Sequence, residues 1–213
     1  MERTLTANKI PINRISPNSL YHKALRLIRK DESANRTECV NLLKRAAQHG
    51  HPRAAYALAT WYLHGIGVRK DFKRGRVLLE QAAKANIQDA NYDLAVCYET
   101  GRGVQKNLKH AFRHYLAAAK AGDRSARTEV ARCYFHGIGT RRDYSESARW
   151  YRIAARQGEA DAQYAIAYAY EKGLGVRKNL RLAILWYTKA HKNGCTDAGQ
   201  AAMLIRGLAD QTK

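Results

Sequence analysis

Residues 123–158 read DRSARTEVARCYFHGIGTRRDYSESARWYRIAARQG, and the pattern of this stretch returns along the chain with a period of 36 residues. The loop glycines recur at Gly65 and Gly67, Gly101 and Gly103, Gly137 and Gly139, and Gly173 and Gly175. An Asp or Asn follows six residues after the first glycine of each loop, as Asp71, Asn107, Asp143 and Asn179. Several independent columns that keep one period indicate a repeat architecture.

Each copy predicts two helices. In the copy that begins near Pro52, apolar residues at Ala54, Leu58 and Tyr62 fall on one face of a helix that ends at His64. The glycine loop then supplies backbone at positive φ, and Asp71 suits the N-cap of a second helix. Asn86, Gly122, Gly158 and Gly194 end the second helices, and these are the residue types that best tolerate a left-handed C-cap.

The ends of the chain depart from the pattern. A leading pair of helices without the glycine loop is expected at Ser19–Lys30 and Arg36–His49, and a last unpaired helix at Asp197–Leu208. We therefore expect eleven helices, with the end elements acting as caps of a solenoid. The expected parts are an extended or disordered arm at 1–17 and a solenoid at 18–209, made of a leading pair at 18–50, repeats at 51–86, 87–122, 123–158 and 159–194, and a capping helix at 196–209.

Composition narrows the class of protein. The 213 residues include 46% hydrophobic residues, which is enough for a sizeable core. No apolar run approaches the roughly 18 residues of a membrane span, and residues 1–15 show no apolar segment of a secretory signal, so we expect a cytoplasmic protein. The 38 basic and 18 acidic residues give a net charge of +20, which predicts attraction to polyanions or acidic surfaces.

The four cysteines show neither a CxxC pair nor a zinc-ligand spacing. Cys97 and Cys133 occupy the repeat position that holds Trp61 and Ala169 in the other copies. A position that accepts Trp, Cys and Ala is typical of core packing. We therefore expect these thiols to be free and buried, with a disulfide or redox pair as the alternative.

The repeat resembles the Sel-one-like repeat family, which is related to the tetratricopeptide repeats. The motif is carried best by Ala126, Val130, Ala131, Tyr134, Gly137, Gly139, Asp143, Trp150, Tyr151, Ala154, Ala155 and Gly158. The resemblance covers roughly residues 35–209, with Ala59 and its equivalents in place of the usual Gly, Thr140 in place of Val, and Gly75 in place of Ala. It implies an all-α, right-handed solenoid whose concave groove binds other proteins, often in bacteria, and it implies no reaction.

Motifs for catalysis are missing from the sequence. There is no HExxH, no Walker-type loop, no GxSxG and no acidic cluster at metal spacing. The GxG loops could be a phosphate-binding signal, but the turn of the repeat already explains them. We therefore expect no catalytic residue, no cofactor and no metal.

Two surfaces are candidates for binding. The positions equivalent to 53, 57, 60 and 64 line one face of each first helix, which forms the groove in tetratricopeptide relatives. The candidate groove residues are Arg53, Thr60, His64, Asp89, Asp93, Glu129, Arg132, His136, Asp161, Tyr168 and Lys172. An ordinary solvent-exposed face would vary between copies in the same way, so the composition of this face leaves both interpretations open.

The second surface is a basic edge at the loops that precede the second helices. Its residues are Arg69, Lys70, Lys73, Lys106, Lys109, Arg141, Arg142, Arg177, Lys178 and Arg181. Cations near a helix N-terminus oppose the helix dipole, so the dipole does not account for them. Repeats of the family that this sequence resembles often carry one Lys there, which leaves an ordinary solvent-exposed edge as the alternative. A second basic column, at Lys84, Lys120, Arg156 and Lys192, falls at helix C-termini, where the dipole favours cations.

These features predict a non-enzymatic adaptor, regulatory or immunity-type protein that binds an acidic protein partner through the groove and the basic edge. The alternative is a nucleic-acid-binding protein that uses the basic edge. We expect the aromatic residues to lie in core columns and not to interleave with the basic edge, so stacking platforms for bases are missing. No RNA- or DNA-reading motif occurs either, and both observations favour the protein partner. No membrane and no small-molecule substrate are expected, and the oligomeric state stays open.

Overall fold

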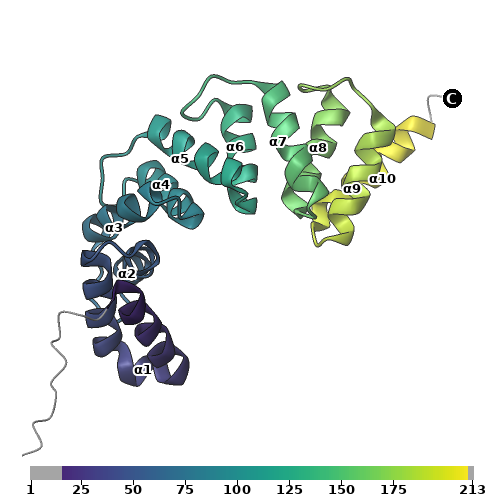
Figure 1. Ribbon diagram of the computed structural model, residues 1–213. Coiled ribbons are helices and arrows are strands. Elements are labelled where there is room, and N and C mark those ends of the chain that lie inside the picture. The colour runs from purple at the N-terminus through teal and green to yellow at the C-terminus, as the bar shows by residue number, and fades with distance from the viewer. Residues whose placement is uncertain (1–15, 211–213) are drawn as a thin grey trace, which may run out of the picture. The chain divides into compact units, whose positions relative to one another are not determined.

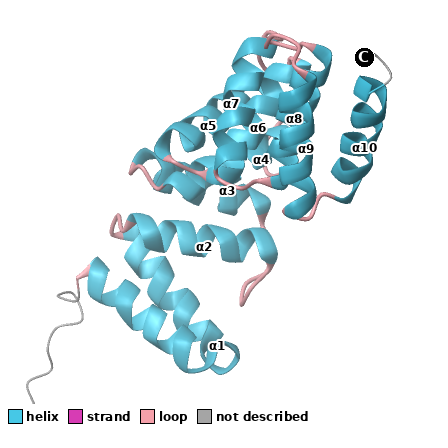
Figure 2. Ribbon diagram, turned by 90° about the vertical axis from the view of Figure 1, so that its right-hand side faces the viewer, coloured by secondary structure: helices cyan, strands magenta, loops and turns pink. Residues whose placement is uncertain are grey.

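The computed structural model describes residues 16–210, with the backbone alone described at 31–34 and 208–210. Over this span the chain forms helices and loops and no strand (Figure 2). The helices are α1 (Pro17–Gln48), α2 (Pro52–His64), α3 (Phe72–Lys84), α4 (Gln88–Thr100), α5 (Leu108–Ala121), α6 (Arg124–His136), α7 (Tyr144–Arg156), α8 (Ala160–Lys172), α9 (Leu180–Lys192) and α10 (Thr196–Asp210). The chain divides into two compact units, 1–87 (unit 1) and 88–213 (unit 2).

Helix α1 reverses direction within its own length. The Cys39 thiol donates to the carbonyl oxygen of Ala24 at 3.7 Å, and Lys23 pairs with Glu38 at 2.8 Å. A straight helix would separate residues 15 positions apart by about 22 Å, so α1 consists of two antiparallel arms (Figure 1). With these arms counted separately, the described residues contain the eleven helices that the sequence predicts.

The beginning of α1 differs from the sequence expectation in two details. The arm expected at 1–17 lies outside the described residues apart from its last two positions, and Pro17 already belongs to α1. Asn35, which shares the register of the capping Asp and Asn residues, does not begin a separate element. It lies inside α1, and its amide group donates to the carbonyl oxygen of Leu27 at 3.4 Å.

The predicted caps define the helix ends. The side chains of Asp71, Asn107 and Asn179 accept hydrogen bonds from backbone N–H groups at 2.9, 3.0 and 3.0 Å. Asp143 accepts from two N–H groups, those of Ser145 and Glu146. The residues that close the second helices adopt the left-handed conformation, at φ values of 61° for Asn86, 109° for Gly122, 92° for Gly158 and 102° for Gly194.

Small residues form the core between the helices. Ala118, Ala154 and Ala190 of the alanine column are all 0% exposed, so neighbouring helices approach closely. The column of Trp61, Cys97, Cys133 and Ala169 is buried in every copy, as a packing position should be. Of the tyrosines that keep the period, Tyr62 is buried, whereas Tyr98, Tyr134 and Tyr170 are only partly buried against the core.

Helix α10 is the single terminal helix that the sequence predicts after the last repeat, and apolar side chains lie on its outer face. Met203 and Leu204 are 73% and 70% exposed, although Ala167, one period before Met203, is fully buried. These two side chains of α10 face solvent because, among the described residues, no second helix covers α10 as α9 covers α8.

Candidate binding surfaces

The loops that carry the basic edge share one backbone arrangement. The capping residue of each second helix donates its N–H to a tyrosine carbonyl of the preceding helix: Asp71 to Tyr62 at 2.9 Å, Asn107 to Tyr98 at 2.8 Å, Asp143 to Tyr134 at 2.9 Å and Asn179 to Tyr170 at 2.8 Å. This bond closes every loop at the same point. The side chains of the two residues before each cap therefore start from equivalent points of the loop in every copy.

In unit 2 these loops lie one beside the next. A β-carbon built on Gly139 would stand 2.0 Å from the carbonyl oxygen of Leu108, and one on Gly175 would stand 2.0 Å from that of Tyr144. Leu108 and Tyr144 are the first residues of α5 and α7. Each loop thus rests on the start of the preceding second helix, next to the preceding loop. Figure 1 shows the α6–α7 and α8–α9 loops at the same end of the helices of unit 2.

The basic edge is exposed and lacks acidic partners. All ten predicted side chains are exposed: Arg69, Lys70 and Lys73 in unit 1, and Lys106, Lys109, Arg141, Arg142, Arg177, Lys178 and Arg181 in unit 2. Within the part of the chain that the structure describes, none of the ten forms an ion pair with an acidic side chain. Unit 2 therefore presents seven basic residues without an ion-pair partner, five on three adjoining loops and two in the first turns of α5 and α9.

The expectation that no aromatic residue accompanies the basic edge is wrong at two positions. The Arg142 guanidinium lies 5.9 Å from the ring centre of Tyr144 and donates to its hydroxyl at 3.4 Å. The Lys70 ammonium lies 5.7 Å from the ring centre of Phe72. Both rings directly follow the capping residue and are half-buried, so they orient these two cations through cation–π contacts.

The predicted groove residues differ in how freely they face solvent. Arg53 and His64 in unit 1 are exposed, and Thr60 is half-buried, with its hydroxyl donating to the carbonyl oxygen of Ala57 at 2.8 Å. In unit 2, Asp89, His136, Asp161 and Lys172 are exposed, whereas Asp93, Glu129, Arg132 and Tyr168 are half-buried. The face of unit 2 is thus mixed in charge, as the sequence indicates.

Arg132 is held by contacts within the fold. It donates to Glu129 on its own helix at 2.7 Å and to Glu99 on α4 at 2.6 Å. Glu99 also accepts a hydrogen bond from the Tyr115 hydroxyl at 2.8 Å. This Glu99 cluster ties α4, α5 and α6 together, so Arg132 and Glu129 are structural residues as well as part of the face.

The charges of the Glu99 cluster are coupled. Burial disfavours the Glu99 carboxylate, but hydrogen bonds from Arg132 and Tyr115 and the charge of Arg132 hold its pKa below the usual value. Burial raises the pKa of Tyr115, and the hydrogen bond to Glu99 raises it further, so the phenol stays protonated as a donor. The carboxylate is therefore ionised and fully engaged at neutral pH.

A related contact recurs two periods later. The Tyr187 hydroxyl donates to Glu171 at 2.9 Å, and Glu171 pairs with Lys172 at 2.6 Å. Phe135 stands between Glu99 and Glu171 in the repeat, so Tyr151 lacks the equivalent carboxylate and burial raises its pKa to about 12. The groove candidate Lys172 thus has an acidic neighbour, as Arg132 has. The Lys172 ammonium also lies 5.8 Å from the ring centre of Tyr168.

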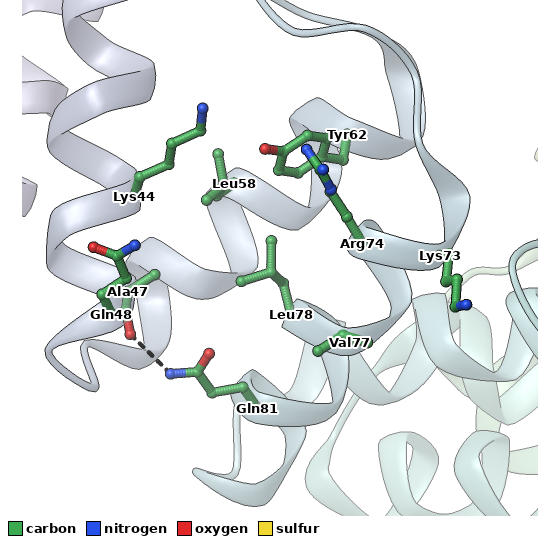
Figure 3. Close-up of a pocket in the computed structure, with 10 residues that line it drawn as sticks. All are labelled: Lys44, Ala47, Gln48, Leu58, Tyr62, Lys73, Arg74, Val77, Leu78 and Gln81. Carbon is green, nitrogen blue, oxygen red and sulfur yellow. Dashed lines mark hydrogen bonds between the residues drawn. The ribbon is translucent and has the colours of Figure 1, made fainter.

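Unit 1 contains a pocket that the sequence did not suggest. It lies between α1, α2 and α3, has a volume of about 640 Å³, and is lined in part by Lys44, Leu58, Tyr62, Arg74 and Leu78 (Figure 3). At one end of the pocket a hydrogen bond joins α3 to α1: the Gln81 amide donates to the carbonyl oxygen of Ala47 at 2.9 Å. An adjoining cavity of about 570 Å³ shares Lys44, Tyr62 and Arg74 and adds Arg69 and Lys70.

The sequence pattern of the Sel1 repeat matches residues 28–51, 52–87, 88–123, 124–159 and 160–195. The chain belongs to the Sel1 repeat family. The first match covers the last part of α1 and the turn that follows it, and the next four each cover a first helix, a loop and a second helix. Sel1 repeats form protein-interaction scaffolds, and the columns that define them here are structural.

Solved Sel1 repeat proteins share the fold. The protective antigen c5321 of uropathogenic Escherichia coli, which displays an SLR fold, is 28% identical with a TM-score of 0.82 over 88% of this chain and 40% of that chain. A Sel1 repeat protein from Oxalobacter formigenes is 25% identical with a TM-score of 0.74 over 88% of this chain and 75% of that chain. The predicted all-α solenoid of helical repeats is confirmed, and this chain spans 40% of the length of c5321. No curated protein matches the chain.

The pocket arises where the Sel1 repeat at 52–87 departs from the other copies. The column that holds His114, Trp150 and Trp186 later in the chain holds Leu78 here, and the column of Tyr115, Tyr151 and Tyr187 holds Leu79. Trp150 is packed into its unit at 9% exposure. Leucine is much smaller than tryptophan, so Leu78 leaves room at this position that a tryptophan would take up.

The described residues offer no metal site. Among them no group of three or more His, Cys, Asp or Glu side chains could hold a metal ion, and none of their helices is long and apolar enough to cross a bilayer. The functional candidates of these Sel1 repeats are therefore surfaces: the basic edge, the groove face and the pocket of unit 1.

Proposed function

We propose that this protein is a non-enzymatic interaction scaffold that binds an acidic protein partner, with the basic edge of unit 2 as its main electrostatic contact. The observation that carries the proposal is the row of three adjoining loops and following helix starts, with seven exposed basic residues and no ion pair to them among the described residues. Like charges held close together repel one another, which destabilises the folded protein. An acidic partner that binds to this edge would offset the repulsion.

The two surfaces have different parts in this proposal. Long-range attraction to the basic edge speeds encounter with an acidic partner and weakens as salt shortens the Debye length from about 10 Å at 0.1 M to about 3 Å at 1 M. The groove residues that change from copy to copy, such as Asp89, Asp161 and Tyr168, then select among acidic partners. Arg132 contributes by holding the shape of this face.

The experiment uses two sets of charge reversals in unit 2. Lys106→Glu, Arg142→Glu and Lys178→Glu reverse the basic edge. Lys120→Glu, Arg156→Glu and Lys192→Glu make the same charge change at the other end of α5, α7 and α9, where the side chains are also exposed. We expect tagged wild-type protein and the second set to capture the same acidic proteins from nuclease-treated lysate at 0.1 M salt, and the first set to lose them.

Nucleic acid is the competing ligand for the same edge. A nucleic-acid binder would lose its captured material on nuclease treatment, and its affinity for a random oligonucleotide would fall linearly in log salt with a slope set by the phosphates neutralised. Nuclease-sensitive capture would therefore contradict the protein-partner proposal. So would equal capture by the two reversed sets.

We also propose that the protein acts in a bacterial cytoplasm. All four cysteines are free and three are buried, which suits a reducing compartment. Both solved relatives described above come from bacteria. A non-reducing digest of the native protein that yielded a disulfide-linked peptide pair would contradict the location.

A further inference from the structure

The pocket of unit 1 combines cationic walls with an apolar interior. Lys44 reaches in from α1, and Arg74 on α3 lies against the ring of Tyr62, with its guanidinium 5.9 Å from the ring centre (Figure 3). Leu58 and Leu78 lie between these walls, and Val77 at the edge is 51% exposed. An apolar surface bordered by cations is the complement of an apolar group that is flanked by anions.

One acidic residue, Asp71, lies beside this pocket. The larger cavity has no acidic lining residue, and Asp71 is the acidic residue of the adjoining one. Asp71 is engaged as the N-cap of α3, where its carboxylate accepts from the Arg74 N–H at 2.9 Å and pairs with the Arg74 side chain at 3.3 Å. Among the described residues neither Lys44 nor Lys70 forms an ion pair, and the Lys70 ammonium lies over the ring of Phe72.

We propose that this pocket binds a short acidic segment of a partner protein, with one large apolar side chain seated on Leu58 and Leu78 and flanking carboxylates against Lys44 and Arg74. This inference rests on the proposed function and assigns a second, separate contact to the same class of partner. A volume of about 640 Å³ is within the range of sites that enclose a ligand group of this size. Burial of a large apolar side chain in a ready-made pocket is also the usual source of binding energy at an interface hot spot.

Charge complementarity selects this occupant over two others. Residues 1–15 of the chain carry three basic residues and one acidic residue, so this segment would bring more positive charge to the cationic walls. A second copy of the chain, with a net charge of +20, is repelled in the same way. A nucleic-acid backbone would satisfy the cations but would leave Leu58, Val77 and Leu78 without an apolar contact.

The test fills the pocket with the residue that the repeat itself uses. Leu78→Trp places tryptophan in the column of Trp150 and Trp186, so we expect the fold to accept it with a melting temperature no lower than that of the wild type. The matched control is Leu78→Met, which keeps the pocket open. Random dodecapeptides displayed on phage are selected on the wild-type protein, and the affinities of the selected peptides are measured by fluorescence anisotropy.

We expect the selected peptides to be rich in Asp and Glu around a Trp, Phe or Leu. Leu78→Trp and Lys44→Glu should each weaken their binding at least tenfold, whereas Leu78→Met and the remote Lys120→Glu should change it less than threefold. Peptides without acidic residues, a failure to select any peptide, or unchanged affinity in folded Leu78→Trp would each overturn the pocket proposal. Loss of partner capture on reversal of Lys106, Arg142 and Lys178 alone, with Leu78→Trp unaffected, would leave the proposed function standing and reject the pocket.

Discussion

Gly175 lies directly against the backbone of Tyr144, so closely that a β-carbon on Gly175 would stand 2.0 Å from the Tyr144 carbonyl oxygen. The second glycine of the loop is therefore required for two reasons. Its φ of +67° favours a residue without a β-carbon, and only such a residue lets one repeat come this close to the preceding one. The same contact joins Gly139 to Leu108.

Gly175→Ala should be far more destabilising than Gly158→Ala. Both positions have positive φ, which costs a residue with a β-carbon about 1–2 kcal/mol. A β-carbon at Gly158 meets nothing within 4 Å, whereas at Gly175 it meets backbone, so we expect a loss above about 3 kcal/mol there. Urea unfolding of the two variants measures the difference, and equal losses would show that the close approach is not maintained in solution.

Asp143→Ala should lower the free energy of unfolding by about 0.5–2 kcal/mol, because two N–H groups of α7 lose their acceptor. Asp143→Asn is the control, since Asn107 and Asn179 cap α5 and α9 from the same position of the repeat. We expect it to unfold within about 0.5 kcal/mol of the wild type in the same urea titration. A silent Asp143→Ala would refute the cap.

Glu99 and Arg132 should behave as a coupled pair. Glu99→Gln and Arg132→Met should each cost about 1–3 kcal/mol, since each removes one charge of a half-buried, charge-assisted hydrogen bond. The double variant should cost less than the sum, because the second change removes a group that the first has already orphaned. Strict additivity in chemical denaturation would mean that the two side chains do not interact.

Acid should weaken unit 2 through the same carboxylate. Because the fold lowers the pKa of Glu99, its stabilisation is present above the unfolded pKa of about 4.3 and disappears as the pH falls through the lowered folded pKa. Glu99→Gln should therefore flatten the decline in stability on the acid side of pH 4.3. Thermal unfolding of both proteins between pH 2.5 and pH 7 tests this, and parallel curves would contradict it.

The thiols should react in a defined order. Burial raises the pKa of Cys133 to about 11 and leaves the side chain 1% exposed, so it should resist alkylation in the native state. Cys195 is only partly buried and should react first. Timed iodoacetamide labelling followed by peptide mass spectrometry gives both rates, and Cys195→Ser should remove the fast phase without changing the slow ones.

The sequence predicted the features that arise within one repeat. Asp143 as a cap and Gly158 as a left-handed terminus follow from local backbone chemistry, which the residue type alone reveals. Contacts between repeats were harder to foresee. The position of Arg132 in the repeat predicts a groove residue. Its pairing with Glu99, 33 positions away, cannot be predicted from that position because it depends on how α4 and α6 pack.

The pocket of unit 1 escaped sequence reasoning for a different reason. Leu78 is an ordinary apolar residue, and its significance appears only when its column is compared with Trp150 and Trp186. The signal was present as a departure from the repeat pattern. The space that it leaves depends on the separation of α1 and α3, which the spacing of residues in the chain does not give.

The contact between each loop and the preceding second helix also makes the repeats of unit 2 interchangeable. If residues 124–159 were excised, the loop glycine now placed on Tyr144 would meet Leu108, which already accepts the equivalent glycine of the excised copy. Whole copies can in this way be lost or duplicated with every junction still matched, whereas inserting one residue into a loop would misalign all of its contacts. Such an array can change the length of its binding surface in steps of 36 residues without inventing a new interface.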